Sequence, residues 1–364
     1  MNIGILNAGG DCPGLNAVIE GAVGAATARG WTVYGFYDGF EGLLSTPDNE
    51  RWRILTRANC LNIRAQGGTI LGTVNQGNFT VKSGVGGRME IAKEVLDRSR
   101  ETVERLGLSA LIVVGGDGSQ TIGMELRKIG LPIVGVPKTI DNDLGATDYT
   151  FGFWTAACVV STNLDRLRTT AYSHQRMMVV EVMGRHAGWI GLYGGISGGA
   201  DVILIPEIPF TLEDVVRKVE LLKALGQREI IVVVSEGATI GGKLITLDEE
   251  TKGEVRLGGI ANFLSTKLET ITGIETRYCV LGHVQRGGSP IPFDRVLGVR
   301  CGAKAVQLIE EGKFGETVAL RGVDMESMPI EDAVRTLHLV DKQSQIVEAA
   351  REIGISFGDE SLQA

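Results

Sequence analysis

The chain has 364 residues, of which 43% are hydrophobic and 22% are charged, and its formal net charge is −8. This is a globular composition with more chain than one core usually serves, which predicts two domains. The acidic balance excludes a broad, unspecific nucleic-acid surface, which needs a basic face, and no run of about 20 apolar residues predicts a membrane span.

Short apolar segments alternate along the chain with longer amphipathic ones. The predicted strands are Ile3–Leu6, Thr32–Phe36, Ala110–Val114, Ile133–Val136, Met177–Val182, Val202–Ile205, Ile230–Val234 and Arg277–Leu281. The predicted helices are Ala17–Arg29, Met89–Leu106, Phe153–Arg168, Leu212–Leu225, Gly259–Leu268 and Phe293–Glu311. Apolar strands that alternate with helices indicate mainly parallel sheets with helices on both faces, so the predicted fold class is α/β.

The alternation is interrupted near residue 150 by a polar stretch, KTIDNDLGATDYTFGF. We therefore expect a first domain at residues 1–152 and a second at residues 153–286. The helical pattern of Phe293–Glu311 has no strand of its own to follow, so residues 287 to about 325 are expected to return to the first domain.

The remaining residues, 326–364, are predicted to form a helical tail. The pattern of Glu331–Ile353 predicts one amphipathic helix, and Gly354 is a plausible stop for it.

Five cysteines (Cys12, Cys60, Cys158, Cys279 and Cys301) are far apart and free of CxxC spacing. This distribution favours free thiols in a reducing compartment. The first residues, MNIGILNAGGD, lack the features of a secretory signal. We therefore expect a cytoplasmic protein without a membrane partner.

Two glycine-rich turns in the first half follow predicted strands. The stretch NAGGDCPG leads into a helix, and N–H groups at a helix N-terminus bind anions, although an ordinary turn would look the same. The stretch VVGGDGSQ combines glycines, which let a phosphate approach the backbone, with Asp117, which repels it. Mg2+ resolves this conflict because it prefers carboxylate, phosphate and water oxygens. Asp117 is thus the predicted metal ligand, with a helix-capping aspartate as the alternative.

A third polar turn, PKTIDNDLG, holds Asp141 and Asp143 two positions apart. Two such acids can share one small site. An aspartate near a metal-bound phosphate can orient an acceptor hydroxyl and take its proton. The alternative is a pair of acids on a surface turn.

Basic residues accumulate at strand starts and glycine turns in the second half, namely Arg176, Arg185, Arg277 and Arg286, with His283 beside the last. Guanidinium groups match phosphate oxygens, so four of them at turns favour a bound phosphate ester. Any one of them alone is more commonly a solvated or salt-bridged side chain. The residues together predict a phosphoryl transferase with a metal–polyphosphate donor and a phosphorylated acceptor.

The motifs GGDCPGLNAVI, GGDGS, PKTIDND, TDYTFGF, SHQRMMVVEVMGRHAG and LGHVQRGGSPIPFDR resemble those of the 6-phosphofructokinase family, in the same order and at similar spacings up to about residue 310. The resemblance implies two Rossmann-like, three-layer α/β domains with the active site in the cleft between them. It also implies a glycolytic kinase that transfers a phosphoryl group from MgATP to the 1-hydroxyl of fructose 6-phosphate. NAD kinases and lipid kinases share GGDG, but they do not explain PKTIDND or the arginine turns. A non-catalytic sugar-phosphate sensor is disfavoured because Asp117 and Asp141 are both present.

Roles implied by the resemblance can be carried over residue by residue. Asp141 is the expected general base, and Thr139 and Arg185 are the other expected catalytic residues. Expected at the donor nucleotide are Gly10, Gly116, Asp117, Gly118 and Ser119, with Mg2+ on Asp117. Expected at fructose 6-phosphate are Thr139, Asp141, Arg176, Met183, Gly184, Arg185, Glu236, Arg277, His283 and Arg286.

Two of these arginines, Arg176 and Arg277, stand where the family uses residues that reach in from a neighbouring subunit. The resemblance therefore implies a homo-oligomer, a dimer or a tetramer, in which the sugar-phosphate site is shared between subunits.

The identity of the phosphoryl donor is the open alternative. Gly118 leaves room for ATP, whereas an aspartate there would favour pyrophosphate. Lys138 is typical of pyrophosphate users, and Asn75 replaces an arginine that many ATP users direct at the donor, a charge that Lys138 or Arg88 would have to supply. We expect ATP, because a steric and charge clash excludes a donor whereas a lysine suits either one.

Overall fold

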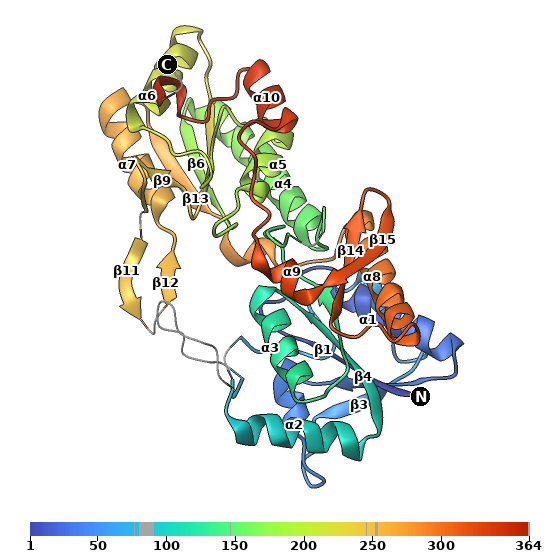
Figure 1. Cartoon of the computed structure of the whole chain (residues 1–364). Coiled ribbons are helices and arrows are strands. Elements are labelled where there is room, and N and C mark those ends of the chain that lie inside the picture. The colour runs from blue at the N-terminus through green and yellow to red at the C-terminus, as the bar shows by residue number, and fades with distance from the viewer. Residues whose placement is uncertain (76, 80–90, 146, 245, 252–253, 363–364) are drawn as a thin grey trace. The chain divides into compact units, whose positions relative to one another are not determined.

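The computed structural model describes residues 1–75, 77–79, 91–145, 147–244, 246–251 and 254–362 (Figure 1). The chain divides into two compact units. Unit 1 comprises Met1–Ile140, Leu144–Trp154 and Arg286–Leu337. Unit 2 comprises Asp141–Asp143, Thr155–Gln285 and His338–Ala364. The chain therefore passes between the units several times, and each unit is described by itself below.

Unit 1 contains a sheet that has seven strands within the described residues. In spatial order they are β15 (Asp324–Pro329), β14 (Glu316–Arg321), β5 (Ile133–Pro137), β4 (Leu108–Gly115), β1 (Asn2–Asn7), β2 (Thr32–Phe36) and β3 (Trp52–Leu55). The central strands pair in parallel, and only the edge strands β15 and β3 are antiparallel to their neighbours. The central strands β1, β4 and β5 are largely apolar and buried, as expected where both faces of a sheet are covered, whereas the edge strand β15 is polar and partly exposed.

The helices of unit 1 are α1 (Leu15–Ala28), α2 (Lys93–Arg105), α3 (Asp117–Lys128), α8 (Pro292–Glu310) and α9 (Ile330–Arg335). Helices α1 and α8 approach closely, because an added Cβ at Gly302 would lie 2.1 Å from the Val18 carbonyl oxygen and one at Gly21 would lie 2.3 Å from that of Val299. Glycine thus permits this packing. Helix α8 is the Phe293–Glu311 pattern, and it packs in unit 1 although it follows unit 2 in the chain.

Unit 2 contains a parallel sheet that the described residues build from four strands. In spatial order they are β13 (Thr276–Val280), β6 (Met177–Val182), β8 (Ile230–Ser235) and β7 (Val202–Leu204). Its helices are α5 (Trp189–Ser197), α6 (Leu212–Ala224), α7 (Ile260–Thr272), α10 (Gln345–Glu352) and all but the first two residues of α4 (Phe153–His174). Two short antiparallel pairs, β9 (Thr239–Ile240) with β10 (Lys243–Leu244) and β11 (Thr246–Thr251) with β12 (Glu254–Leu257), lie between β8 and α7 in the chain.

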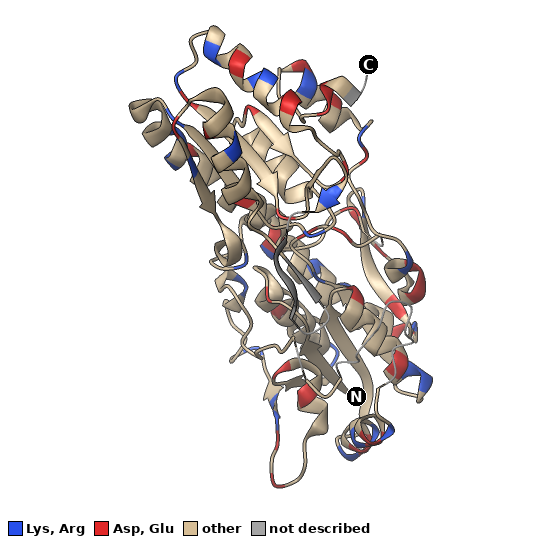
Figure 2. Ribbon diagram, turned by 90° about the vertical axis from the view of Figure 1, so that its left-hand side faces the viewer, with Lys and Arg blue, Asp and Glu red and all other residues tan. Residues whose placement is uncertain are grey.

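The predicted α/β class with mainly parallel sheets is confirmed. Each predicted strand matches an observed one, and charged residues lie mainly on helices and loops rather than on the strands (Figure 2). Sequence patterns missed α3 and α5, which begin in glycine-rich stretches. The first two residues of the predicted Met89–Leu106 helix lie outside the described residues, and α2 begins at Lys93. Arg88 lies outside them as well.

The prediction of one helix over Glu331–Ile353 is wrong, because the structure has α9 and α10 with an extended segment between them. Thr336, which follows α9, has extended backbone angles, and Leu337 forms a β-bridge with Leu144. Pairing with another segment thus outweighs the local helical pattern. Residues up to Leu337 pack in unit 1 and those from His338 onward in unit 2.

No helix of the described chain is both long and apolar enough to cross a membrane.

Candidate active site

Two basic side chains from other segments of unit 1 contact the turn between β1 and α1. The Lys138 ammonium donates a hydrogen bond to the Gly10 carbonyl oxygen, and Arg286 Nη1 donates to that of Asp11 at 3.2 Å. A Cβ on Gly10 would lie 2.9 Å from Arg286 Nη1, so only glycine lets the guanidinium lie this close. Lys138 comes directly after β5, and Arg286 opens the last segment of unit 1. Residues far apart in the sequence thus place positive charge on the first glycine turn.

The second glycine turn continues into helix α3, whose N-cap is Gly116 and which has no side-chain cap. Its first N–H groups are therefore available to an anion. Asp117 is exposed in the first helical turn, and an added Cβ on Gly118 would meet nothing within 4 Å. Gln120 anchors the turn because its amide donates to the carbonyl oxygens of Val113, Gly115 and Val136 at 3.0 to 3.3 Å.

The two glycine turns lie next to each other. The Cβ position of Gly9 is 3.4 Å from both the Lys138 ammonium nitrogen and the Ser119 hydroxyl oxygen. The predicted donor residues Gly10, Gly116, Asp117, Gly118 and Ser119 are therefore brought together with Lys138 and Arg286 in unit 1. Backbone N–H groups, a hydroxyl and two cations form a site suited to a polyphosphate.

A metal would find few protein ligands at this place. Among the described residues, no group of three or more His, Cys, Asp or Glu side chains could hold one. This fits Mg2+, which commonly takes one or two carboxylates and fills its other positions with water and substrate phosphate. Asp117, exposed at the second glycine turn, could be such a carboxylate.

The PKTIDND segment divides between the units. Thr139 belongs to unit 1, where its carbonyl oxygen accepts a hydrogen bond from the Thr150 hydroxyl at 2.7 Å. Asp141 is only 5% exposed and belongs to unit 2 with Asn142 and Asp143. Asn142 has φ 54°, in the left-handed region that asparagine tolerates better than most residues.

The Met183–Arg185 turn follows β6 in unit 2 and is fixed from two sides. Gln285 Oε1 accepts from Met183 N, and Glu236 Oε1 accepts from Arg185 N, each at 3.3 Å. Burial raises the pKa of the Glu236 carboxyl. Hydrogen bonds from the backbone N–H groups of Arg185 and Gly184 partly oppose this rise. Since Glu236 follows β8, this part of the site lies at the carboxyl ends of two neighbouring parallel strands.

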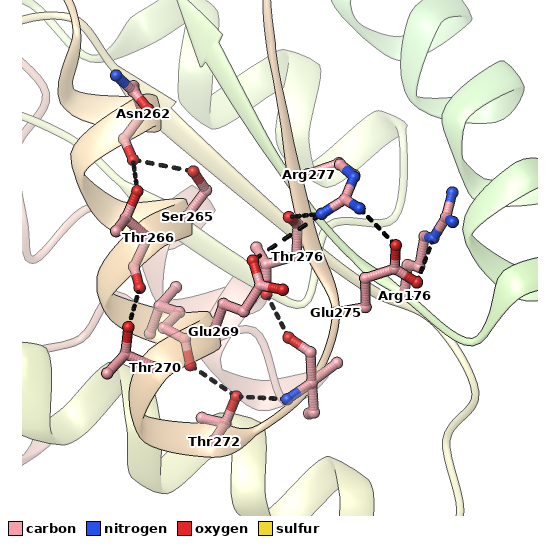
Figure 3. Close-up of polar contacts among 12 residues, drawn as sticks. Arg176, Asn262, Ser265, Thr266, Glu269, Thr270, Thr272, Glu275, Thr276 and Arg277 are labelled. Atoms are coloured by element: carbon pink, nitrogen blue, oxygen red, sulfur yellow. Dashed lines mark hydrogen bonds and ion pairs between the residues drawn. The ribbon is translucent and has the colours of Figure 1, made fainter.

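Arg176 and Arg277 lie at the other edge of the same sheet, at the starts of β6 and β13 (Figure 3). Glu275 bridges them, with Oε2 2.8 Å from Arg176 Nε and Oε1 accepting from Arg277 Nη2 at 2.5 Å. The short contact with the Arg176 guanidinium is the main cause that lowers the pKa of Glu275. Glu269 is 3.9 Å from Arg277 Nη1, too far for a hydrogen bond.

The predicted acceptor residues therefore do not all converge within one chain. Six residues of β6 separate Arg176 from Met183, which corresponds to roughly 20 Å of extended strand. His283 is exposed in the 3-10 helix η3 (Gly282–Gln285) after β13, and Arg286 is grouped with unit 1. Arg176 and Arg277 form one group, and the Met183–Arg185 turn with Glu236 forms another.

Several residues that organise these sites were not singled out from the sequence. Gln120 and Gln285 fix the two turns, and Glu275 joins the arginine pair. Gln285 and Glu275 stand inside the stretches HVQRGG and GIETRYC, next to residues that were singled out. Sequence gave no signal for their contacts, because each is set by the register between segments.

Comparison with known proteins agrees with this arrangement. A model of the phosphofructokinase family matches residues 2–309. An ATP-dependent 6-phosphofructokinase of Chloroflexus aggregans is 51% identical over 363 residues, which cover 99% of this chain and 98% of that protein. A protein of Amycolatopsis mediterranei named pyrophosphate–fructose 6-phosphate 1-phosphotransferase is 44% identical over 364 residues, which cover 98% of this chain and 100% of that protein. The chain belongs to the phosphofructokinase family.

A solved structure, phosphofructokinase of Pichia pastoris in the T-state, superposes with a TM-score of 0.79 at 31% identity. The match covers 100% of this chain and 37% of the yeast chain. The present chain thus spans little more than a third of the length of that relative.

Proposed function

We propose that the protein is an ATP-dependent 6-phosphofructokinase, which transfers a phosphoryl group from MgATP to the 1-hydroxyl of fructose 6-phosphate in glycolysis, in the cytoplasm. The observation that carries this proposal is the meeting of both glycine turns with Lys138 and Arg286 in unit 1. The full-length similarity to an ATP-dependent 6-phosphofructokinase supports it independently. Unit 1 then is the donor domain, and unit 2 provides most of the acceptor site.

The donor site uses backbone more than side chains. The N–H groups at the start of α3 and the hydroxyl of Ser119 bind phosphate oxygens, and Gly118 leaves room for the nucleotide. Asp117 would hold Mg2+, which, when bound, neutralises charge on the donor phosphates. Lys138 and Arg286 add positive charge at Gly10.

The acceptor site combines a base with hydrogen-bonding groups for the sugar phosphate. Asp141 takes the proton of the 1-hydroxyl as it attacks, Thr139 orients the groups around it, and Arg185 stabilises the charge that develops on the transferred phosphoryl group. The sugar phosphate is bound by Met183, Gly184, Glu236, His283 and Arg286 of one chain. Arg176 and Arg277 come from a neighbouring chain.

A homo-oligomer, either a dimer or a tetramer, is part of the proposal. Its support is the roughly 20 Å of strand β6 between Arg176 and Met183, a separation that one phosphorylated sugar does not bridge easily. Arginines at the opposite edge of the sheet are better placed to serve a site on another copy of the chain.

Pyrophosphate is the second candidate donor, and Lys138 favours it because its ammonium lies on the first glycine turn. A relative at 44% identity carries a pyrophosphate-dependent name. The test is phosphorylation of fructose 6-phosphate with Mg2+ and either ATP or pyrophosphate as the sole donor. Activity with ATP alone supports the proposal, whereas activity with pyrophosphate alone replaces ATP by the alternative. Activity with neither donor contradicts both.

A further inference from the structure

Residues 338–340 lie against two segments of the acceptor site, although the family model ends at residue 309. His338 and Val340 belong to unit 2, as do Asp141–Asp143 and the turn at Arg185. The contacts of this short piece of the tail therefore fall within one compact unit.

His338 binds the two residues that follow Asp141. Its backbone N–H donates to the Asp143 carbonyl oxygen at 2.8 Å, and its Nδ1 is 3.1 Å from the Asn142 carbonyl oxygen. A carbonyl oxygen only accepts, so this second contact is a hydrogen bond when Nδ1 carries the ring proton. Two consecutive carbonyl groups beside Asp141 are thus fixed by one residue. One of them belongs to Asn142, whose φ of 54° costs more than an ordinary backbone conformation.

The opposite side of His338 is attached to the start of helix α5. Trp189 Nε1 donates to the His338 carbonyl oxygen at 2.7 Å, and the two rings are 4.7 Å apart. One residue further on, Val340 N donates to Glu207 Oε1 at 2.9 Å, and the same carboxylate accepts from Gly188 N. Gly188 is the N-cap of α5 and follows the Met183–Arg185 turn by three residues.

We propose that His338 is a positioning residue for the reaction, which joins the segment of Asp141 to the helix that follows the Met183–Arg185 turn. This inference rests on the proposed function, because it takes Asp141 as the base. Base catalysis depends strongly on geometry, so a carboxylate on a loosened segment transfers its proton less efficiently without any change in the residues that hold the sugar phosphate.

Two variants separate the hydrogen bond of His338 from its ring. His338→Phe keeps an aromatic ring against Trp189 but removes the donor to Asn142. His338→Asn loses the ring but places an amide N–H near the position of Nδ1. The exposed neighbour provides the control, Leu339→Ala, since Leu339 is 45% exposed.

We expect His338→Phe to lower kcat about fivefold to tenfold, as the loss of one ordinary hydrogen bond does when its whole effect falls on the transition state, while KM for fructose 6-phosphate stays within about twofold. His338→Asn should restore most of kcat, and Leu339→Ala should behave as the wild type. An unchanged kcat in His338→Phe would overturn the proposal. So would an equal loss in His338→Asn.

Two further measurements keep the result decisive. If His338→Phe does not fold, Trp189→Phe removes the donor to the His338 carbonyl oxygen, and an unchanged kcat there overturns the proposal. Hydrogen exchange of the peptide spanning residues 139–145 needs no activity, and it should be faster in His338→Phe than in the wild type. Inactivity of the wild type with fructose 6-phosphate would contradict the proposed function instead. Faster hydrogen exchange in His338→Phe would then still support the attachment of residues 139–145 by His338. Unchanged exchange would overturn that attachment.

Discussion

The two units present their cations differently. In unit 1, Lys138 and Arg286 donate to the backbone carbonyl oxygens of Gly10 and Asp11. In unit 2, Arg176 and Arg277 share the carboxylate of Glu275. A phosphate at the first place meets cations oriented by a glycine turn, whereas a phosphate at the second has to compete with a carboxylate. If both regions bind phosphate as proposed, the turn of Gly10 holds its cations ready for an anion, whereas at Glu275 a phosphate has to replace the carboxylate.

The largest expected effect comes from Asp141→Ser, which leaves both cation groups intact. Removal of a general base usually costs about 10^2-fold or more, so kcat should fall at least that far. KM for fructose 6-phosphate should change much less, because the cations remain. Steady-state kinetics measures kcat and KM, and the control is Asp165→Ser, which changes an exposed residue of helix α4. A near-normal kcat in Asp141→Ser would mean that another group is the base.

Gly118→Asp tests the donor site formed by the glycine turns of unit 1. The added side chain has room in the fold, since nothing lies within 4 Å of the Cβ position, but its charge would face the donor phosphates. We expect KM for ATP to rise about tenfold or more, which corresponds to about 1.4 kcal/mol of like-charge repulsion. Gly118→Ala adds the Cβ without the charge and should change little. Equal ATP kinetics in the wild type and Gly118→Asp would place the donor elsewhere.

Glu275→Gln tests the arginine pair of unit 2, Arg176 and Arg277. Exposed ion pairs contribute little, so removing the competing charge should lower KM for fructose 6-phosphate only about twofold to fivefold. Glu269→Gln is the matched control, because this carboxylate lies 3.9 Å from Arg277 and should matter less. A rise of KM in Glu275→Gln would show that Glu275 orients the arginines instead of competing with the phosphate.

A smaller effect is expected on the pH dependence of stability, through Glu207, which binds Val340 of the tail. Burial raises the pKa of Glu207 above 4.5, although N–H groups of Val340 and Gly188 oppose this. As pH rises above 4.5, the unfolded chain releases this proton before the folded chain does. Protonation of Glu207 therefore favours the folded state at low pH, and this contribution is lost as pH rises through the folded-state pKa.

Glu207→Gln removes this titration and keeps one acceptor oxygen. Urea unfolding between about pH 4.5 and 7 should show that the free energy of unfolding declines less in the variant than in the wild type as pH rises. Parallel pH curves for the two proteins would contradict the pKa shift of Glu207.

Much of this molecule follows from local pattern. The β1, β4 and β6 strands are largely apolar, and the turns after them carry glycines and charged residues with recognisable chemistry. Helix α3 was missed because GGDGS looks like a turn, although its backbone continues as a helix from Asp117. The prediction of one helix in the tail was wrong because Leu337 pairs with Leu144, a partner almost two hundred positions away.

The sequence by itself determined the α/β class, the glycine turns and the residues that resemble a phosphofructokinase, because period, turn chemistry and short motifs are local properties. Only the tertiary structure decided that Arg286 lies on the turn of Gly10, that Glu275 joins Arg176 to Arg277, and that His338 reaches Asn142. These contacts join segments up to hundreds of positions apart. They depend on which strands pair and which segments return to which unit, and no local pattern encodes that choice.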